Sequence, residues 1–433
     1  MSNKKTLRFW VTLVLFSLIG QVAWVVENMY FNVFIYNMFS ASAAEISAMV
    51  AASSVVATVT TVFIGALSDK LGRRKIFISA GYVLWGVSIL GFALVREDII
   101  SSVFPTATSV SAICIVITII LDCVMTFFGS SANDAAFNAW LTDETEEGGR
   151  GKAEGVNAMM PLMAILVVFG GFMSFDLTLA SSWTVIFAVI GGVVLAIGIA
   201  SFFLIKEERR SVTDTAYFKN LIFSFKPSTV KKNPIFYLTI LAFAIFGISI
   251  QIFMPYLIIY YEVSLGLDNY VLIMAPAIII AAAVTVFFGR FYDRAGFAAS
   301  AYTALALLGL GFILLSLFKN TVLVFIGSLL MMTGYLAGMA VFGAMLRDRT
   351  PKDRAGAFQG VRIIGQVLIP GIIGPAIGAA VLSSAEKMVG NDGRESFIPN
   401  QNIFIAALAV CILTAGAVFL VNRLAGKKLL KNN

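Results

Sequence analysis

Twelve apolar runs dominate this chain of 433 residues and limit what it can fold into. A helix needs roughly 20 apolar residues to cross the hydrocarbon core of a bilayer, so runs of this length between charges predict membrane spans. The composition agrees, since 59% of the residues are apolar and 13% are charged, and so much apolar surface must face lipid. The expected spans are residues 9–36, 45–67, 76–95, 111–133, 155–175, 183–205, 235–261, 270–290, 298–317, 321–346, 357–383 and 401–422.

The distribution of Lys and Arg predicts the topology. With the N-terminus in the cytoplasm, 26 of these residues lie in cytoplasmic segments, four lie outside, and Arg362 lies within a span. By the positive-inside rule, we expect a multi-pass protein of the plasma (inner) membrane with both termini cytoplasmic. The net charge of +7 is therefore a topology signal, and no nucleic-acid partner is expected. We expect an N-terminal six-helix bundle (1–205), a cytoplasmic linker (206–234) and a C-terminal six-helix bundle (235–433).

Several kinds of chemistry have no support in the sequence. The chain contains no histidine, which removes the commonest proton carrier at neutral pH and the commonest metal ligand. Its three cysteines lie in apolar runs, and no phosphate-binding loop, dinucleotide fingerprint, serine elbow or CxxC motif occurs. We therefore expect neither an enzyme nor an ATP-driven pump, with no cofactor and no metal site, and we expect a monomer.

Two spacing patterns occur once in each half of the chain. G-x3-D-x2-G begins at Gly65 and again at Gly289, and D-x-T-x5-G-x3-G-V begins at Asp143 and again at Asp348. Two matches in the same order, in corresponding loops, predict an internal repeat of six spans. Glycines permit tight turns, and charges near helix ends can hold a loop in one state. We expect a cytoplasmic gate formed by Gly65, Asp69, Gly72, Arg73, Arg74, Asp143, Arg150, Asp293, Asp348, Arg354 and Arg362; plain positive loops with capping aspartates are the alternative.

Two carboxylates inside spans are the main candidates for a binding site. An ionisable group in hydrocarbon costs a few kcal/mol, so Glu27 and Asp122 suggest function, although either could merely orient helices. A carboxylate can bind sugar hydroxyls, a proton or sodium, and an aromatic face can pack on a sugar ring. Polar stripes at helical spacing lead us to expect substrate or cation binding by Glu27, Asp122, Trp24, Asn28, Phe31, Asn32 and Thr126, and in the second half by Gln251, Tyr256, Tyr335 and Gln366.

The segment GALSDKLGRRK, with its degenerate copy after Gly289, resembles the loop between helices two and three of the major facilitator superfamily. The resemblance implies an all-α membrane protein whose twelve helices form two pseudosymmetric six-helix bundles, with alternating access to a midplane site. The order of parts is also similar to the glycoside/pentoside/hexuronide cation symporters, although the second span carries hydroxyls such as Ser53 where those symporters usually carry aspartates.

The resemblance implies symport of a sugar or glycoside, driven by protons or sodium, with a small-molecule substrate and membrane lipids as partners. Two alternatives remain open at this point. One is a proton-coupled exporter or flippase of lipophilic compounds or lipids, and the other is a membrane sensor that does not transport.

Overall fold

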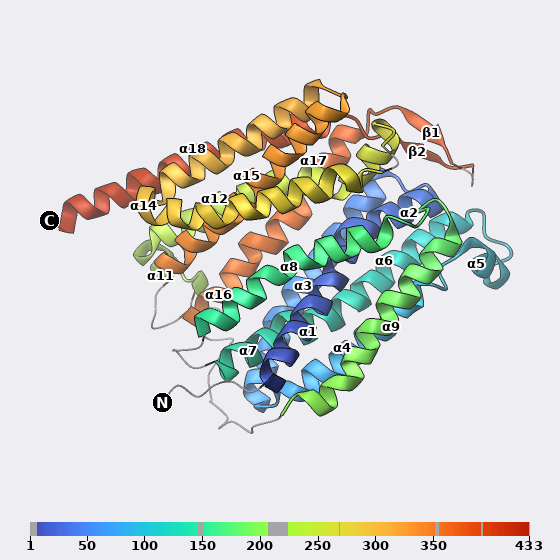
Figure 1. The fold of residues 1–433 in the computed structure, drawn as a ribbon, viewed down its shortest axis with the longest axis horizontal. Helices are drawn as coiled ribbons and strands as arrows, with labels where there is room; N and C mark the ends of the chain where they lie inside the picture. Colours follow the sequence, from blue (N-terminus) through green and yellow to red (C-terminus); the bar gives the residue numbers. More distant parts are fainter. Residues whose placement is uncertain are drawn as a thin grey trace. The chain divides into compact units, whose positions relative to one another are not determined.

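The computed structural model describes residues 7–145, 150–206, 224–267, 269–350, 355–390 and 393–432. In this part of the chain, eleven helices are long and apolar enough to cross a membrane. Figure 1 shows the helices as coiled ribbons. The chain is thus an all-α, multi-pass membrane protein. Its described residues divide into two compact units.

One of the eleven helices contains two of the predicted spans. Helix α14 (Val271–Leu317) has 47 residues and would be about 70 Å long if straight, more than twice the thickness of the bilayer core. Gly296 interrupts it with φ 78° and ψ 177°, a conformation open to glycine because it has no Cβ. The interruption separates the spans predicted at 270–290 and 298–317, so the eleven helices contain all twelve predicted spans.

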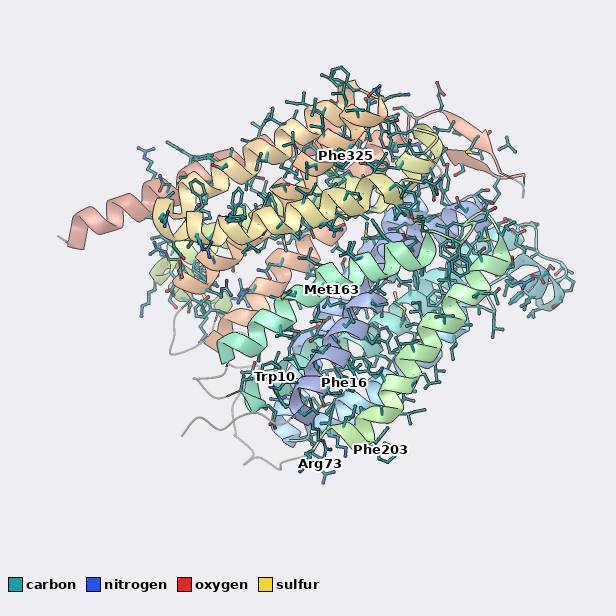
Figure 2. All side chains as sticks on the ribbon, viewed as in Figure 1. Trp10, Phe16, Arg73, Met163, Phe203 and Phe325 are labelled. Carbon is teal, nitrogen blue, oxygen red and sulfur yellow. The ribbon has the colours of Figure 1, made fainter. Side chains whose placement is uncertain are left out.

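The first unit comprises Met1–Thr215 with Met388–Ser396. Its helices α4 and α9 pack closely together. They can do so because residue 86 is glycine: a Cβ at this position would lie 2.5 Å from the backbone nitrogen of Leu195. Small residues allow such close approach between helices in lipid. Phe16 of α1 is fully buried within this unit, whereas Phe203 at the end of α9 is 76% exposed (Figure 2). The elements are α1 (Leu7–Val25), η1 (Val26–Tyr30), α2 (Phe31–Phe39), α3 (Ala43–Leu71), α4 (Arg74–Phe92), α5 (Glu97–Val103), α6 (Val110–Gly129), η2 (Ser130–Phe137), α7 (Asn138–Glu144), α8 (Arg150–Phe172) and α9 (Ala180–Leu204).

The second unit comprises Ala216–Lys387 with Phe397–Asn433. Helix α14 packs along α15, and α12 packs between α17 and α18. The phenol of Tyr256 donates to the carbonyl of Pro375 over 3.2 Å, which fixes the seventh span against the eleventh. The elements are α11 (Pro227–Lys232), α12 (Pro234–Phe253), η3 (Met254–Tyr256), α13 (Leu257–Ile259), η4 (Tyr260–Ser264), α14, α15 (Thr321–Arg349), α16 (Ala355–Ile363), η6 (Ile364–Leu368), α17 (Ile369–Leu382) and α18 (Asn402–Asn432).

A small antiparallel hairpin, which the sequence analysis does not predict, joins α17 to α18. Its strands are β1 (Lys387–Val389) and β2 (Glu395–Phe397), and its residues 388–396 group with the first unit. Arg394 pairs with Glu45 at 3.0 Å, and Ser396 donates to the carbonyl of Ala41. Glu45 also accepts from the backbone nitrogen of Ser42 at 2.8 Å, which is half of a capping box that begins α3.

Four of the spans contain a short π-helical segment. These segments are η1 in the first span, η2 in the fourth, η4 in the seventh and η6 in the eleventh. A π segment inserts one extra residue into a helix and is frequent at functional sites. The extra residue rotates everything beyond it by about 100° relative to the preceding helix. Side chains before and after each segment therefore deviate from the positions that a continuous α-helix would give them.

Candidate functional site

Glu27 lies in the π segment of the first span and is 7% exposed. The i+5 hydrogen bond from the backbone nitrogen of Phe31 to the carbonyl of Val26 closes the widened turn that contains it. The Oγ1 of Thr126, in α6, donates to Glu27 Oε1 over 2.8 Å. The other carboxylate oxygen, Oε2, is buried and has no hydrogen-bond partner among the described residues.

Asp122 lies one turn before Thr126 on α6 and is 1% exposed. It accepts a hydrogen bond from Ser53 of α3, and its charge acts directly on Glu27. Its Oδ1, like Glu27 Oε2, is buried without a partner in the described chain. The first unit thus gathers two carboxylates and two hydroxyls from three spans. Buried carboxylate oxygens without donors are chemically suited to take up a proton or a cation.

Trp24 lies one turn before Glu27 and forms an aromatic wall with Trp85 of α4. Their ring centroids are 5.0 Å apart, and both indole Nε1 atoms are buried with no partner among the described residues. Gly129 of α6 makes room for the two rings, since a Cβ there would lie 2.8 Å from Trp85 and 2.9 Å from Trp24. The sequence analysis identified Trp24 but missed Trp85, which carries no polar pattern of its own.

The remaining candidates of the first span are not all on one face. Asn28 is exposed and donates to the carbonyl of Trp24, while Asn32 is buried and donates to the carbonyl of Asn28. Phe31 packs instead in an apolar cluster with Phe92, at 4.5 Å between ring centroids. Trp24 and Phe31 nevertheless both pack against α4, because their partners Trp85 and Phe92 both lie on that helix.

Polar side chains continue along the fourth span beyond Asp122 at intervals of four residues. Ser130 donates to Asp134 Oδ2 over 3.0 Å, and the side chain of Asn138 donates to the carbonyl of Asp134. The charge of Asp134, which is half-buried, also acts on Glu27. The sequence analysis missed Asp134 because it ended this span at residue 133. It also missed Ser130, which lies within the span, although the four-residue spacing was a usable signal.

A buried hydrogen-bond chain fixes the inner part of the same bundle. Asn133 of η2 donates to the phenol oxygen of Tyr82 over 2.6 Å, and Tyr82 donates to the carbonyl of Phe16 over 2.9 Å. The chain joins the first, third and fourth spans, and Asn133 lies eleven residues beyond Asp122 on the fourth span.

The candidates of the second unit are polar but uncharged. Gln251 is half-buried beside Gly374, where an added Cβ would collide with the Cβ of Gln251, and Tyr256 is engaged by Pro375. Tyr335 of α15 and Gln366 of η6 are both half-buried. Among the described residues no group of three or more His, Cys, Asp or Glu side chains could hold a metal ion.

In the first unit, the structure joins the two loops that carry the repeated motifs. Gly72 ends α3 with φ 60°, and Arg73 precedes α4. Arg74 pairs with Asp143 of α7 at 3.4 Å between Nε and Oδ2, and it also donates to Ser68. Gly65 lies in the last two turns of α3. The side chains of Asp69 and Arg150 lie outside the described structure.

The second unit joins its corresponding loops through a different pair. Tyr292, which precedes Asp293, donates to Asp348 Oδ2 over 2.6 Å. The first aspartate of the D-x-T motif is thus the acceptor in both units. Arg362 is half-buried, its Nε has no partner among the described residues, and the charge of Arg347 acts on it. The predicted gate residue Arg354 lies outside the described residues.

Comparisons with known proteins identify the fold. The structure is similar to that of the nucleoside transporter NupG, with a TM-score of 0.69 and 13% identity over 95% of this chain and 98% of that one. It is also similar to a bacterial homolog of the human lysosomal transporter Spinster, inward-facing and unoccupied, with a TM-score of 0.75 and 15% identity over 97% and 98%. No curated protein matches.

The family comparison covers most of the chain. Residues 11–375 match the family described as Major Facilitator Superfamily. This match includes both motif repeats and the carboxylates of the first unit. The chain belongs to the Major Facilitator Superfamily and is a membrane transporter.

Proposed function

We propose that this transporter is a cation-coupled symporter that takes up a sugar or glycoside by alternating access. The observation that carries the proposal is the buried pair of Glu27 and Asp122, supported by the hydroxyls of Thr126 and Ser53. Two carboxylates that stay charged in hydrocarbon would be very unfavourable, so binding a proton or sodium stabilises the pair. A cation that must occupy this pair couples its own movement to that of the substrate.

The substrate class follows from the groups beside the pair. The indole of Trp24 offers a half-buried apolar face together with an Nε1 donor that no described residue uses. Such a face and donor, next to carboxylate acceptors, suit a ring that has both hydroxyls and an apolar side. Nucleosides are themselves glycosides of a base, and the similar structure NupG is described as a nucleoside transporter. They therefore belong in the first panel of substrates.

Uptake by proteoliposomes tests the proposal. Purified protein is reconstituted, and accumulation of sugars, aryl glycosides and nucleosides is measured under an imposed proton gradient or sodium gradient. We expect accumulation of one class above its equilibrium level under one of the two gradients. The proposal is wrong if no compound of the panel accumulates under either gradient.

Variants test the site separately. Glu27→Gln and Asp122→Asn should abolish gradient-driven accumulation, since an amide carries no titratable charge. Asp176→Asn is the matched control, because Asp176 lies outside the spans and its carboxylate bonds only the neighbouring Thr178 in the described structure. Wild-type rates in both site variants would remove these residues from the coupling site.

One observation favours a second candidate, the export of lipophilic compounds. The first unit has a hollow of about 480 Å³ between α3 and α6, whose lining is apolar except for Thr60. Val55, Val59 and Phe63 contribute to it. Greater accumulation of a lipophilic dye in cells that lack the protein, without any sugar uptake, would support export over symport.

A further inference from the structure

The fourth span carries one polar side chain on each turn from its middle to its predicted cytoplasmic end. These side chains follow one another at intervals of four residues and are Asp122, Thr126, Ser130, Asp134 and Asn138. Side chains four residues apart on a helix are neighbours, with Cβ atoms about 5–6 Å apart. The row extends over about 24 Å along the helix axis, which is most of the bilayer core. It therefore forms a polar line from the buried carboxylates towards one membrane surface.

Asp134 is the accessible residue of an otherwise buried segment. It lies in η2, whose seven other residues are all buried, whereas Asp134 is half-buried. The exposed Asn138 follows one turn later and donates to the backbone carbonyl of Asp134. A carboxylate that faced hydrocarbon would cost a few kcal/mol. The accessible side of Asp134 therefore faces water or polar groups.

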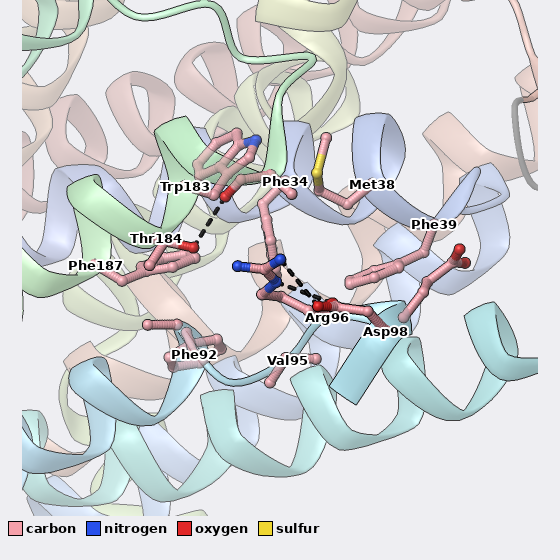
Figure 3. A pocket seen from close by; sticks show the side chains of 13 residues that line it. Phe34, Met38, Phe39, Phe92, Val95, Arg96, Asp98, Trp183, Thr184 and Phe187 are labelled. Atoms are coloured by element: carbon pink, nitrogen blue, oxygen red, sulfur yellow. Dashed lines mark hydrogen bonds and ion pairs between the residues drawn. The ribbon is translucent and has the colours of Figure 1, made fainter. Parts of the chain in front are cut away.

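Asp134 also differs from an acid whose charge is fixed by a cation. In the pocket of Figure 3, Arg96 donates to Asp98 through Nε and Nη2, each over 3.0 Å. These hydrogen bonds lower the pKa of the Asp98 carboxyl below its usual value, so it stays anionic. Asp134 instead accepts from the neutral hydroxyl of Ser130 over 3.0 Å, and no cation among the described residues pairs with it. Its carboxylate is therefore able to take up and release a proton.

Two hydroxyls connect Asp134 with Glu27. Thr126 donates to Glu27 Oε1 over 2.8 Å, and Ser130, one turn later, donates to Asp134. The charge of Asp134 acts on Glu27, whose Oε2 is buried without a partner among the described residues. A hydroxyl both donates and accepts hydrogen bonds, and one water molecule can bridge two hydroxyls one helical turn apart. The row thus provides a chain of groups that can pass a proton between the two acids.

Two other titratable side chains face these acids. Asp122 of α6 acts on Glu27 and belongs to the buried pair. Tyr82 of α4 senses the charge of Asp134, but its phenol already donates to a backbone carbonyl and accepts from a side-chain amide. The hydroxyl proton of Tyr82 is thus engaged. Asp134 is therefore the group of this row that can carry a proton away from the pair.

We infer that Asp134 is a proton-relay residue that joins the buried pair to the cytoplasmic side. This role rests on the proposed function, since Glu27 must carry the coupling proton. The O–H bond of the Glu27 carboxylic acid breaks, its proton passes to the chain of hydroxyls and water, and the chain delivers one proton to the Asp134 carboxylate. Glu27 is then anionic and Asp134 neutral. Asp134 next releases the proton to water, so one proton moves and both carboxylates are restored.

The rate at which Glu27 takes up a proton tests the relay without any substrate. Purified full-length protein receives a rapid drop in pH, and time-resolved infrared spectroscopy follows the carboxylic C=O band that Glu27→Gln removes. We expect Asp134→Asn to slow the appearance of this band by about 100-fold, the lower end of what a positioned proton carrier contributes. The final amplitude of the band should stay as in the wild type. A wild-type rate in Asp134→Asn would overturn the inference.

Two kinds of rescue separate a relay from a structural role. Asp134→Glu keeps a carboxyl group and should restore the rate. Added formate, a small weak acid, should restore the rate of Asp134→Asn, because it supplies a mobile carboxyl group where the fixed one is missing. Asp98→Asn is the matched control, since Asp98 is 63% exposed and paired with Arg96, and it should behave as the wild type does. A slow rate that neither glutamate nor formate restores would show that Asp134 is structural.

Failure of the relay is distinguishable from failure of symport. If the wild type accumulates no sugar, glycoside or nucleoside, the proposed function is wrong, and the infrared rates still decide whether Asp134 passes protons to Glu27. If accumulation is driven by sodium alone, or if Asp134→Asn retains full proton-driven accumulation, the relay is wrong and symport stands.

Discussion

Replacing Gly129 with alanine tests whether the close approach of α6 to Trp24 and Trp85 organises the carboxylate site. The added methyl group would lie 2.8 Å from Trp85 Cε2 and 2.9 Å from Trp24 Cη2. Carbon atoms in good contact are about 3.5–4.0 Å apart, so each ring must move by more than half an ångström. Trp85 is fully buried and cannot give way, which leaves the half-buried Trp24 to move.

The expected cost follows from overpacking. Extra atoms in a well-packed interior usually cost about 1–3 kcal/mol. Alanine is about 1 kcal/mol better than glycine in a helix, which would mask part of this effect. Gly192→Ala in α9 is the matched control, because a Cβ at Gly192 meets nothing within 4 Å. The helix-propensity gain cancels between the two variants, and the overpacking of Gly129→Ala remains.

Thermal unfolding of the purified variants measures this difference. For a unit of about 200 residues, 1 kcal/mol shifts Tm by about 2–4 °C, so Gly129→Ala should melt about 2–12 °C below Gly192→Ala. In a protein that already carries Trp24→Ala, Gly129→Ala should lower Tm by less than it does in the wild type, because one clashing ring is absent. If Gly129→Ala melts no lower than Gly192→Ala, the tight contact around Gly129 does not exist.

Three further outcomes are expected. Tyr82→Phe removes a buried hydroxyl that has hydrogen-bond partners on two sides, so it should lower the free energy of unfolding by about 1–3 kcal/mol. The control Tyr302→Phe, at an exposed side chain, should change this free energy little. Equal melting temperatures of the two variants would contradict the prediction. A double-mutant cycle of Arg74→Gln and Asp143→Asn, measured by chemical denaturation, should give a coupling free energy of about 0.2–1 kcal/mol between the two side chains, because both are partly exposed to solvent. A larger coupling would contradict this and show that the pair is effectively desolvated. Asp134→Asn should slow gradient-driven uptake while leaving exchange of substrate across the membrane intact, and equal loss of both rates would make Asp134 structural.

The hydropathy pattern predicts the spans well, and the reason is physical. Each run long enough to cross a bilayer must form its backbone hydrogen bonds internally, so helix is the available choice. The pattern also marks Glu27, Asp122 and Thr126, which the structure brings together. These three residues are recognisable because charge or hydrogen-bonding capacity in lipid is costly wherever it occurs.

Other parts of the site depend on geometry that hydropathy does not encode. The hydropathy of Val26–Tyr30 does not distinguish a π segment from an α-helix, so the extra residue in the first span is seen in the structure alone. Ser53 is one of several hydroxyls on its span, and only the approach of α3 to α6 selects it. The contact between Arg74 and Asp143 joins loops 69 residues apart, a distance in sequence over which no periodicity extends.

The π segments have a consequence for how such a chain tolerates changes in length. Each one is, in effect, a single surplus residue accommodated within a span. Deleting one residue from Val26–Tyr30 would restore regular α-helical winding and turn the chain beyond it by about a quarter of a rotation. After the deletion of one codon there, the span would still be long and apolar enough to cross the membrane. Different side chains would, however, face the carboxylates. Variation in length within spans one, four, seven and eleven is thus a route by which relatives of this chain can change their sites without a single substitution.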